Sequence, residues 1–179
     1  ENGITFGETS FAAAMSACQK GRQWERALSL LEKIRESNMI CNVISFNGAI
    51  AACQKGRQWA RALSLFDKMR KDGVTCNVIT FNAAISSCEK GANWEHALSL
   101  LNRMREAHIT LEEISFSAAI SACEKGKQWG CALSLFDMMC KTSMTFNVIS
   151  FNSAMSSSAV VGRWGCALSL LENILRTGL

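Results

Sequence analysis

The chain contains 179 residues, of which 49% are hydrophobic and 19% are charged, and its formal net charge is +4. These proportions are typical of a globular protein and exclude an intrinsically disordered chain. The small positive charge allows an anionic partner without requiring one. No apolar run reaches the roughly 18 residues of a membrane-spanning helix, so we expect no membrane partner.

One sequence pattern recurs along the whole chain with a period of 35 residues. The segment Ala-Leu-Ser-Leu keeps this interval, and so does every tryptophan of the chain. A period of roughly 20 to 50 residues indicates an array of stacked units, none of which buries a core alone. The tryptophans are Trp24, Trp59, Trp94, Trp129 and Trp164.

The period divides the chain into units that we expect to form one continuous domain. Residues 1–7 match the tail of a preceding unit. Complete units span 8–42, 43–77, 78–112 and 113–147, and a partial unit spans 148–179. The chain begins without methionine and inside a unit, so we expect it to be a piece of a longer array, with targeting and effector segments in the missing flanks.

Each unit starts with a sequence that predicts a helix. In the unit 43–77, Phe46, Ile50 and Cys53 are spaced at i, i+4 and i+7, which places them on one face of a helix. Asn42 precedes this helix and is suited to cap its first turn, as Asn77 and Asn147 are in later units. Gly56 follows the helix, and we expect it to adopt the left-handed conformation that ends many helices.

A second apolar stripe predicts a second helix from about residue 58 to residue 70. It consists of Trp59, Ala62, Leu63, Phe66 and Met69, which again share one helical face. Each unit is therefore expected to be a helical hairpin. The predicted fold is all-α, an α-solenoid of stacked hairpins that forms a superhelical array, with the first helices lining a concave surface.

The cysteines and histidines show no pattern of a catalytic or metal site. Four of the nine cysteines share one slot of the repeat, and equivalent slots of stacked hairpins lie on the order of 10 Å apart, too far for a disulfide. We expect unpaired thiols and a reducing compartment. His96 and His108 are isolated, and no nucleophile is paired with a base. The sequence predicts no catalytic residue, no metal, no cofactor and no enzymatic activity.

A second face of each first helix carries a recurring, mixed set of residues. In the unit 43–77 it holds Ile44, Asn47, Ala51 and Lys55, an apolar, a polar, a small and a cationic residue. A small residue leaves room for a ligand, and one lysine per unit suits regularly spaced anions. The alternative is that the lysines only complement the helix dipole and the polar residues are simply hydrated.

These residues resemble the pentatricopeptide repeat family. The resemblance rests on the period of 35 residues, on Val-Ile-Ser-Phe-Asn from Val43 to Asn47, on Lys55 to Arg57, and on Ala-Leu-Ser-Leu-Phe-Asp-Lys-Met from Ala62 to Met69. It covers all five units. Tetratricopeptide arrays are related helical hairpins, but their period is about 34 residues and their motif differs.

The resemblance implies binding of single-stranded RNA in RNA metabolism, such as stability, processing, editing or translation, with one base per repeat. In the family, the second residue of a repeat sandwiches the base, and the fifth and last residues read it. The sandwiching residues would be Thr9, Ile44, Ile79, Ile114 and Ile149. The reading residues would be Ala12, Asn42, Asn47, Asn77, Asn82, Glu112, Ser117, Asn147 and Asn152. The phosphate-binding lysines would be Lys20, Lys55, Lys90 and Lys125.

The resemblance also suggests which base each unit prefers. Asn47 with Asn77 resembles a pyrimidine reader, and Ser117 with Asn147 resembles an adenine reader. The remaining units give partial assignments. Asn82 with Glu112 is similar to a uridine pair, Asn152 favours a pyrimidine, and Ala12 leaves the unit 8–42 unassigned because it has no hydrogen-bonding side chain.

Two further expectations concern partners and location. The family resemblance suggests a mitochondrion or plastid. The alternative function is a protein–protein interaction scaffold of the tetratricopeptide type, whose concave face would carry apolar anchors that vary between units. The recurring Asn, Ser and Lys of the present stripe favour RNA. Other proteins are expected to bind, if at all, through the missing flanks.

Overall fold

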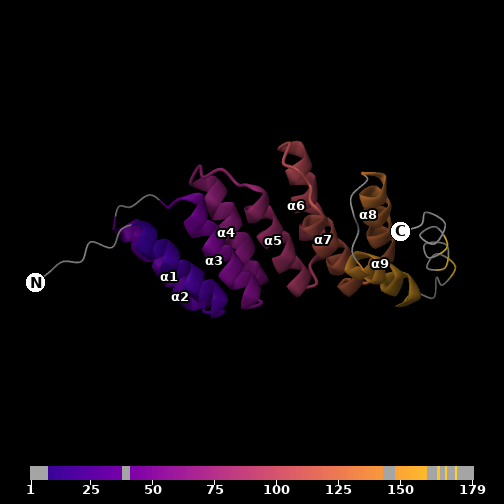
Figure 1. Ribbon diagram of the computed structural model, residues 1–179, viewed down its shortest axis with the longest axis horizontal. Helices are drawn as coiled ribbons and strands as arrows, with labels where there is room; N and C mark the ends of the chain where they lie inside the picture. Colours follow the sequence, from indigo (N-terminus) through magenta and orange to yellow (C-terminus); the bar gives the residue numbers. More distant parts are fainter. Residues whose placement is uncertain are drawn as a thin grey trace, which may run out of the picture. The chain divides into compact units, whose positions relative to one another are not determined.

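The computed structural model describes residues 8–37, 41–142 and 148–160, together with residues 165, 168 and 172. Its regular structure in these ranges is entirely α-helical, in nine helices of 13 residues each (Figure 1). In chain order the helices are α1 (Glu8–Lys20), α2 (Trp24–Glu36), α3 (Val43–Lys55), α4 (Trp59–Lys71), α5 (Val78–Lys90), α6 (Trp94–Glu106), α7 (Glu113–Lys125), α8 (Trp129–Lys141) and α9 (Val148–Val160). The predicted all-α class is confirmed.

Two of the first helices begin at the predicted asparagine caps, α3 at Asn42 and α5 at Asn77, whereas α7 begins at Glu112 without a side-chain cap. The side-chain oxygen of Asn42 accepts a hydrogen bond from the Ser45 backbone N–H at 3.0 Å. Asn77 accepts one from the Thr80 backbone N–H at 3.0 Å. Each bond satisfies a donor that has no partner within the helix. The third expected cap, Asn147, lies outside the described residues.

The predicted role of the glycine after each first helix is wrong. Gly56 has a φ of −78° and Gly126 has a φ of −80°. The left-handed residue is the next one, Arg57 at φ 58° and Lys127 at φ 57°. The Arg57 N–H donates to the Gln54 carbonyl and the Gln58 N–H donates to the Cys53 carbonyl. This is the Schellman pattern, in which the left-handed position follows the cap residue by one.

The packing of a tryptophan explains why the position after the first helix is a glycine. A methyl group built on Gly56 would overlap Cδ1 of Trp24, and one built on Gly126 would overlap Cδ1 of Trp94. The tryptophan that opens a second helix therefore packs directly on the end of the next first helix. Arg61 covers Trp24 as well, with its guanidinium carbon 4.2 Å from the ring centroid.

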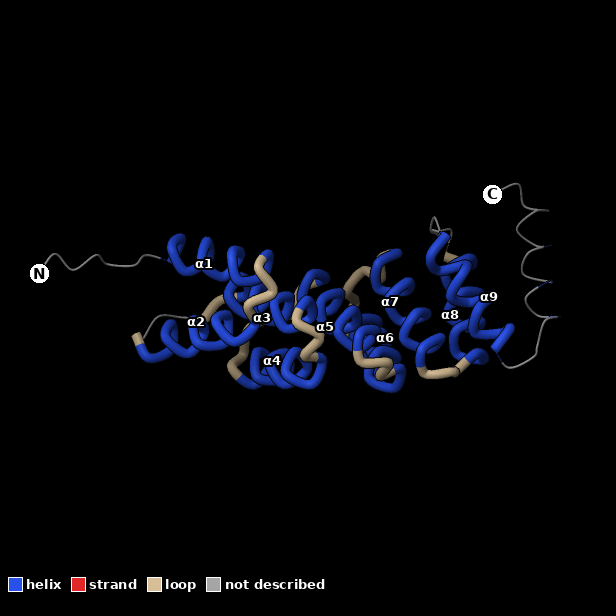
Figure 2. Tube along the Cα trace, turned by 90° about the horizontal axis from the view of Figure 1, so that it is seen from below, coloured by secondary structure: helices blue, strands red, loops and turns tan. Residues whose placement is uncertain are grey.

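The hairpins stack within each of two compact units, which span Glu1–Ser87 and Cys88–Leu179. In the first unit α1 packs on α2 and α3, and α3 packs on α2 and α4. In the second unit α7 packs on α6, α8 and α9, and α8 also packs on α9 (Figure 2). The first helices α3 and α7 thus each contact the second helix of their own hairpin and the second helix of the preceding hairpin. This is the stacking of an α-solenoid.

The two predicted apolar stripes form the core. Phe46, Ile50 and Cys53 of α3 are fully buried, and so are Ala62 and Met69 of α4. Phe66 is buried too, and its ring meets Phe81 of α5 edge-on at 4.9 Å between centroids. Trp59 and Leu63 are only half-buried, because they lie at the margin of the stripe.

Eight cysteines of the described residues are free thiols. Cys166 lies outside the described residues. Burial raises the pKa of the Cys53 thiol to about 11 and the pKa values of Cys88 and Cys123 to about 12. These thiols therefore remain protonated at neutral pH and pack as small apolar groups. None of the nine helices is long and apolar enough to cross a membrane.

Candidate nucleic-acid interface

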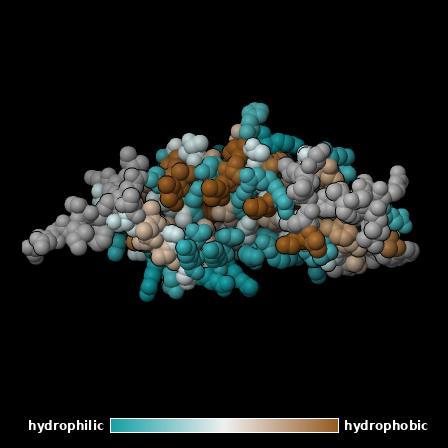
Figure 3. All heavy atoms as spheres, in the orientation of Figure 1, coloured by the Kyte–Doolittle hydropathy of each residue, from teal (hydrophilic) through white to brown (hydrophobic). Residues whose placement is uncertain are grey.

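Four isoleucines project into solvent from the first turns of the first helices. Their exposed fractions are 59% for Ile44, 64% for Ile79, 58% for Ile114 and 63% for Ile149. Figure 3 shows apolar side chains at the surface between hydrophilic ones. Their recurrence at one repeat slot makes this face of the first helices a candidate contact surface. The side chain of Thr9, the fifth member of this set, lies outside the description.

Asn47 and Asn77 meet although 30 residues separate them in sequence. Asn47 lies on α3, and Asn77 is the residue before α5. The Asn47 Nδ2 group donates to Asn77 Oδ1 at 3.2 Å. Thr80 of α5 joins the pair, because its hydroxyl donates to Asn47 Oδ1 at 2.6 Å and accepts from the Asn77 backbone N–H at 3.2 Å.

The backbone N–H and the side-chain hydroxyl of Thr80 together fix the orientation of both amides. The Thr80 N–H requires an acceptor, so the atom of Asn77 that caps it is the oxygen. The atom of Asn47 that faces this oxygen is then a nitrogen, and Asn47 Oδ1 turns to the Thr80 hydroxyl. Both amide oxygens are thus occupied within the protein. The N–H groups of Asn77 Nδ2 and the second N–H of Asn47 Nδ2 are left as donors.

A similar contact occurs between α7 and α9. The hydroxyl oxygens of Ser117 and Ser150 lie 2.6 Å apart, and either can be the donor. Ser117 is half-buried and Ser150 is fully buried. Asn147, the expected partner of Ser117 in reading a base, lies outside the described residues.

The remaining expected reading residues differ in their exposure and contacts. Asn42 accepts a hydrogen bond from the Ser45 hydroxyl at 3.2 Å in addition to its capping bond. Ala12 on α1 and Asn82 on α5 are half-buried. Glu112 before α7 and Asn152 on α9 are exposed.

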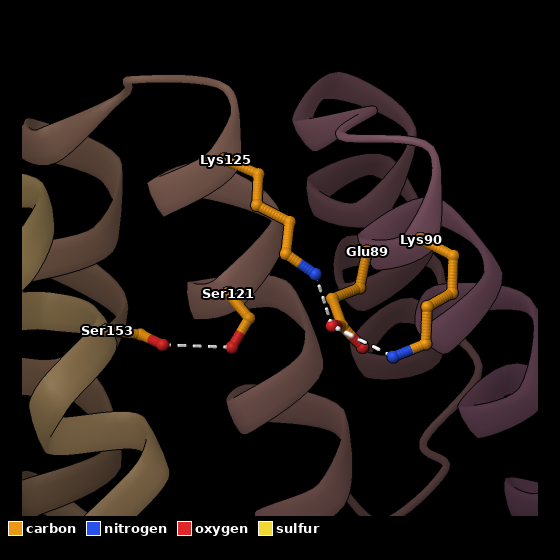
Figure 4. A network of polar contacts seen from close by, with 5 residues as sticks. All are labelled: Glu89, Lys90, Ser121, Lys125 and Ser153. Carbon is orange, nitrogen blue, oxygen red and sulfur yellow. Dashed lines mark hydrogen bonds and ion pairs between the residues drawn. The ribbon is translucent and has the colours of Figure 1, made fainter.

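The four expected phosphate-binding lysines end α1, α3, α5 and α7, and all four are exposed. Two of them share one carboxylate. Lys125 Nζ lies 2.6 Å from Glu89 Oε1, and Lys90 Nζ lies 3.2 Å from the same oxygen (Figure 4). Glu89 is not among the residues that the sequence pattern singles out. A difference between the units could have identified it. The residue before the lysine is Gln19 or Gln54 in the first two units, but Glu89 or Glu124 in the next two.

Ser121 on α7 occupies the slot of Ala51 two units earlier, so its place on the stripe suggests exposure, but it does not face solvent. It is 7% exposed, and its hydroxyl oxygen lies 3.0 Å from that of Ser153 on α9 (Figure 4). The small side chain at this position therefore serves contact between α7 and α9. Gly48 on α3 fits the same explanation, because a methyl group there would overlap Met15 of α1.

Among the described residues, no group of three or more His, Cys, Asp or Glu side chains could hold a metal ion. The polar groups that the structure brings together are amides, hydroxyls and ion pairs. They are suited to hydrogen bonding and to phosphate binding.

Comparison with protein families identifies the repeat itself. The PPR repeat family matches residues 42–90, and the PPR repeat matches residues 9–39, 79–109 and 114–142. No match was found among curated protein sequences.

Several solved structures share the fold. The crystal structure of the pentatricopeptide repeat protein PPR10 from maize has a TM-score of 0.73 and 22% identity, covering 95% of this chain and 24% of that one. The PPR domain of Arabidopsis thaliana protein-only RNase P 1, solved in complex with tRNA, has a TM-score of 0.79 and 15% identity, covering 92% and 87%. Nuclear proteinaceous RNase P 2 of the same species has a TM-score of 0.81 and 14% identity, covering 93% and 38%.

The chain therefore spans about a quarter of the length of the maize protein. The matched repeats cover more than half of the present chain, and the stacked hairpins are those of the solved relatives. The protein belongs to the pentatricopeptide repeat family.

Proposed function

We propose that this chain is a non-catalytic module that binds single-stranded RNA in RNA metabolism and reads one base with each repeat. The proposal uses the repeat units 8–42, 43–77, 78–112, 113–147 and 148–179. The observation that carries it is the contact between Asn47 and Asn77. These two amides, at the fifth and last positions of one unit, present N–H donors beside the exposed side chains of Ile44 and Ile79.

The chemistry of this site suits a base. An exposed isoleucine on either side offers an apolar surface to the flat faces of a base. The donors of Asn47 and Asn77 suit the O2 acceptor that all pyrimidines carry. We therefore assign a pyrimidine to the unit 43–77. The same scheme assigns uridine to Asn82 with Glu112, adenine to Ser117 with Asn147, and a pyrimidine to Asn152, read 5′ to 3′ from the N-terminal end.

The relatives support RNA as the partner. The PPR domain of protein-only RNase P 1 was solved in complex with tRNA. PPR10 was solved with an 18-nt psaJ RNA element, at a TM-score of 0.59 and 17% identity to the present chain. We propose that the exposed lysines of the first helices hold the phosphates of such a strand, and that the module acts in a mitochondrion or plastid.

The proposal is tested by changing one reading residue. Ser117→Asn places an amide where Asn47 lies in the unit 43–77, opposite Ser150 instead of Thr80. We expect the preferred base at that position to change from adenine to a pyrimidine, by about tenfold in relative affinity. Fluorescence anisotropy with short single-stranded RNAs that differ at this one base provides the measurement.

Lys55→Ala is the matched control for a phosphate contact. Lys55 is exposed and ends α3, and a phosphate contact carries no base information. This variant should weaken binding to all the RNAs by the same factor. If Ser117→Asn also lowers every affinity equally, the surface does not read bases, and a protein-binding scaffold becomes the better explanation.

A further inference from the structure

The first helices α3, α5 and α9 each have a buried hydroxyl at their third residue. Ser45 on α3 is 9% exposed, and Thr80 on α5 and Ser150 on α9 are 0% exposed. Ser115 on α7 occupies the same slot and is also fully buried. A hydroxyl this deeply buried must find its hydrogen bonds within the protein. The partners that it finds belong to the residues that the proposed function assigns to base reading.

Thr80 gives the most complete case. A hydroxyl has one proton, and the nearest acceptor is Asn47 Oδ1 at 2.6 Å, closer than Asn77 Oδ1 at 3.0 Å. Thr80 is inaccessible to water, so no solvent molecule competes for its hydroxyl proton. The side chain of Thr80 thus holds the Asn47 amide with its oxygen inward and its nitrogen toward Asn77.

The other units show that the contact follows the chemistry of the fifth residue. Where the fifth residue is Ser117, the hydroxyl of Ser150 meets it at 2.6 Å. Where the fifth residue is Ala12, which has no acceptor, the hydroxyl of Ser45 donates to Asn42 instead. The hydroxyl therefore contacts the fifth residue of the preceding unit at Asn47 and at Ser117, which are both polar.

We propose that Thr80 and Ser150 are positioning residues for base recognition, each setting the hydrogen-bonding orientation of the reading residue in the preceding unit. This inference rests on the proposed function. An asparagine amide has two nearly equivalent orientations about its last side-chain bond, and a flip exchanges donor for acceptor. Thr80 removes this ambiguity for Asn47. The reading code of a unit then depends on a third residue, which lies in the next unit and is buried, so it does not touch the RNA.

The test is the removal of the hydroxyl without loss of volume. Thr80→Val should reduce the preference for a pyrimidine over adenine at the base opposite the unit 43–77 from about tenfold to less than about threefold. The probes are short single-stranded RNAs that differ at this base alone, bound to the whole 179-residue chain. Thr80→Ser retains the hydroxyl and should retain the preference.

Ser87→Ala is the matched control on the same helix. Ser87 is also fully buried, but its hydroxyl donates to the Ala83 carbonyl at 2.7 Å. Its loss should leave the base preference unchanged. If Thr80→Val keeps the wild-type preference, or lowers all affinities by one factor, the positioning role is overturned. If the wild-type chain itself shows no preference at this base, the proposed base reading is refuted. The positioning role of Thr80 is then refuted as well, because it rests on that reading.

Ser150→Ala provides a second test in the other compact unit, which decides the matter if Thr80→Val does not fold. It should reduce the preference for adenine opposite the unit 113–147. Ser158→Ala is its control, because the hydroxyl of Ser158 is equally buried but donates to the Ala154 carbonyl at 3.1 Å. An unchanged adenine preference in Ser150→Ala would refute the proposal, and a change in both variants would reduce it to a general packing effect.

Discussion

At the scale of single residues, the structure gives several repeated positions a role that differs from the one their residue type suggests. Gly56 is a glycine because Trp24 lies against it, not because its backbone is left-handed. Thr80 is buried on a helix, but its hydroxyl and its backbone N–H donate to the side chains of Asn47 and Asn77 in another repeat. In each case the cause is a neighbour in space from the adjacent hairpin.

The contact between Gly56 and Trp24 predicts a loss of stability in Gly56→Ala. The added methyl group would overlap the tryptophan ring, and overpacking of this kind costs about 1–3 kcal/mol. Urea unfolding followed by circular dichroism should show a lower midpoint. Gly130→Ala is the control, because a methyl group there meets no atom within 4 Å and replaces a helical glycine. The free energy of unfolding of Gly130→Ala should rise by about 0.5–1 kcal/mol. A lower free energy of unfolding in both variants would refute the explanation.

At the scale of elements, the hairpin turns between a first and a second helix share one backbone pattern. A residue with positive φ follows the cap at Arg22, Arg57, Ala92 and Lys127. None of these is a glycine, although the left-handed conformation costs an ordinary residue about 1–2 kcal/mol. The turn tolerates this cost because the tertiary contacts of the two helices determine where the chain reverses.

This strain predicts that Ala92→Gly stabilises the protein. Ala92 has a φ of 52° and is exposed, so the substitution removes a steric penalty without removing a contact. Glycine has an entropic cost that offsets part of this relief, so we expect the free energy of unfolding to rise by about 0.5–1 kcal/mol. The same substitution at Ala13, which is exposed within α1, should instead cost about 0.5–1 kcal/mol. Urea midpoints that shift in the same direction for both variants would contradict this account.

At the scale of the whole molecule, the positive charge is mild, and part of it is compensated at the candidate interface. Glu89 is partly buried, with 18% of its side chain exposed, and it pairs with Lys90 and Lys125. A phosphate that binds these lysines competes with an internal carboxylate. The two lysines of the first compact unit, Lys20 and Lys55, follow a neutral glutamine in the same slot.

Glu89→Gln should therefore strengthen RNA binding and make it more sensitive to salt. Four free lysines would give a slope of about −2 to −3 when the logarithm of the binding constant for a single strand is plotted against the logarithm of the salt concentration. Because Glu89 compensates two of these lysines, we expect a wild-type slope of about −2. We expect the slope to steepen by about 1 in the variant. Glu95→Gln, exposed on α6, changes the net charge equally and is the control. Equal effects of both variants would show that net charge alone, and not the pairing of Glu89, sets the affinity.

Much of the fold was predictable because it depends on local periodicity. The stripe of Phe46, Ile50 and Cys53 predicts a buried helix face, and these residues are buried. The caps at Asn42 and Asn77 were also predictable, since each needs only a side chain three residues before a backbone donor. The roles of the reading residues remain predictions that rest on the family resemblance, and the boundaries of the units remain predictions that rest on the repeat period.

The sequence by itself determined the repeat period, the two helices of each unit and the residues they bury. The helices and their buried faces depend only on residues three, four and seven positions apart, which lie on one face of a helix. Only the tertiary structure decided which atoms of Asn47 and Asn77 face outward, why Gly56 is a glycine, and that Glu89 pairs with Lys125. These features join residues about one repeat apart. Helical spacing within a segment does not encode them, because they arise only when one hairpin packs against the next.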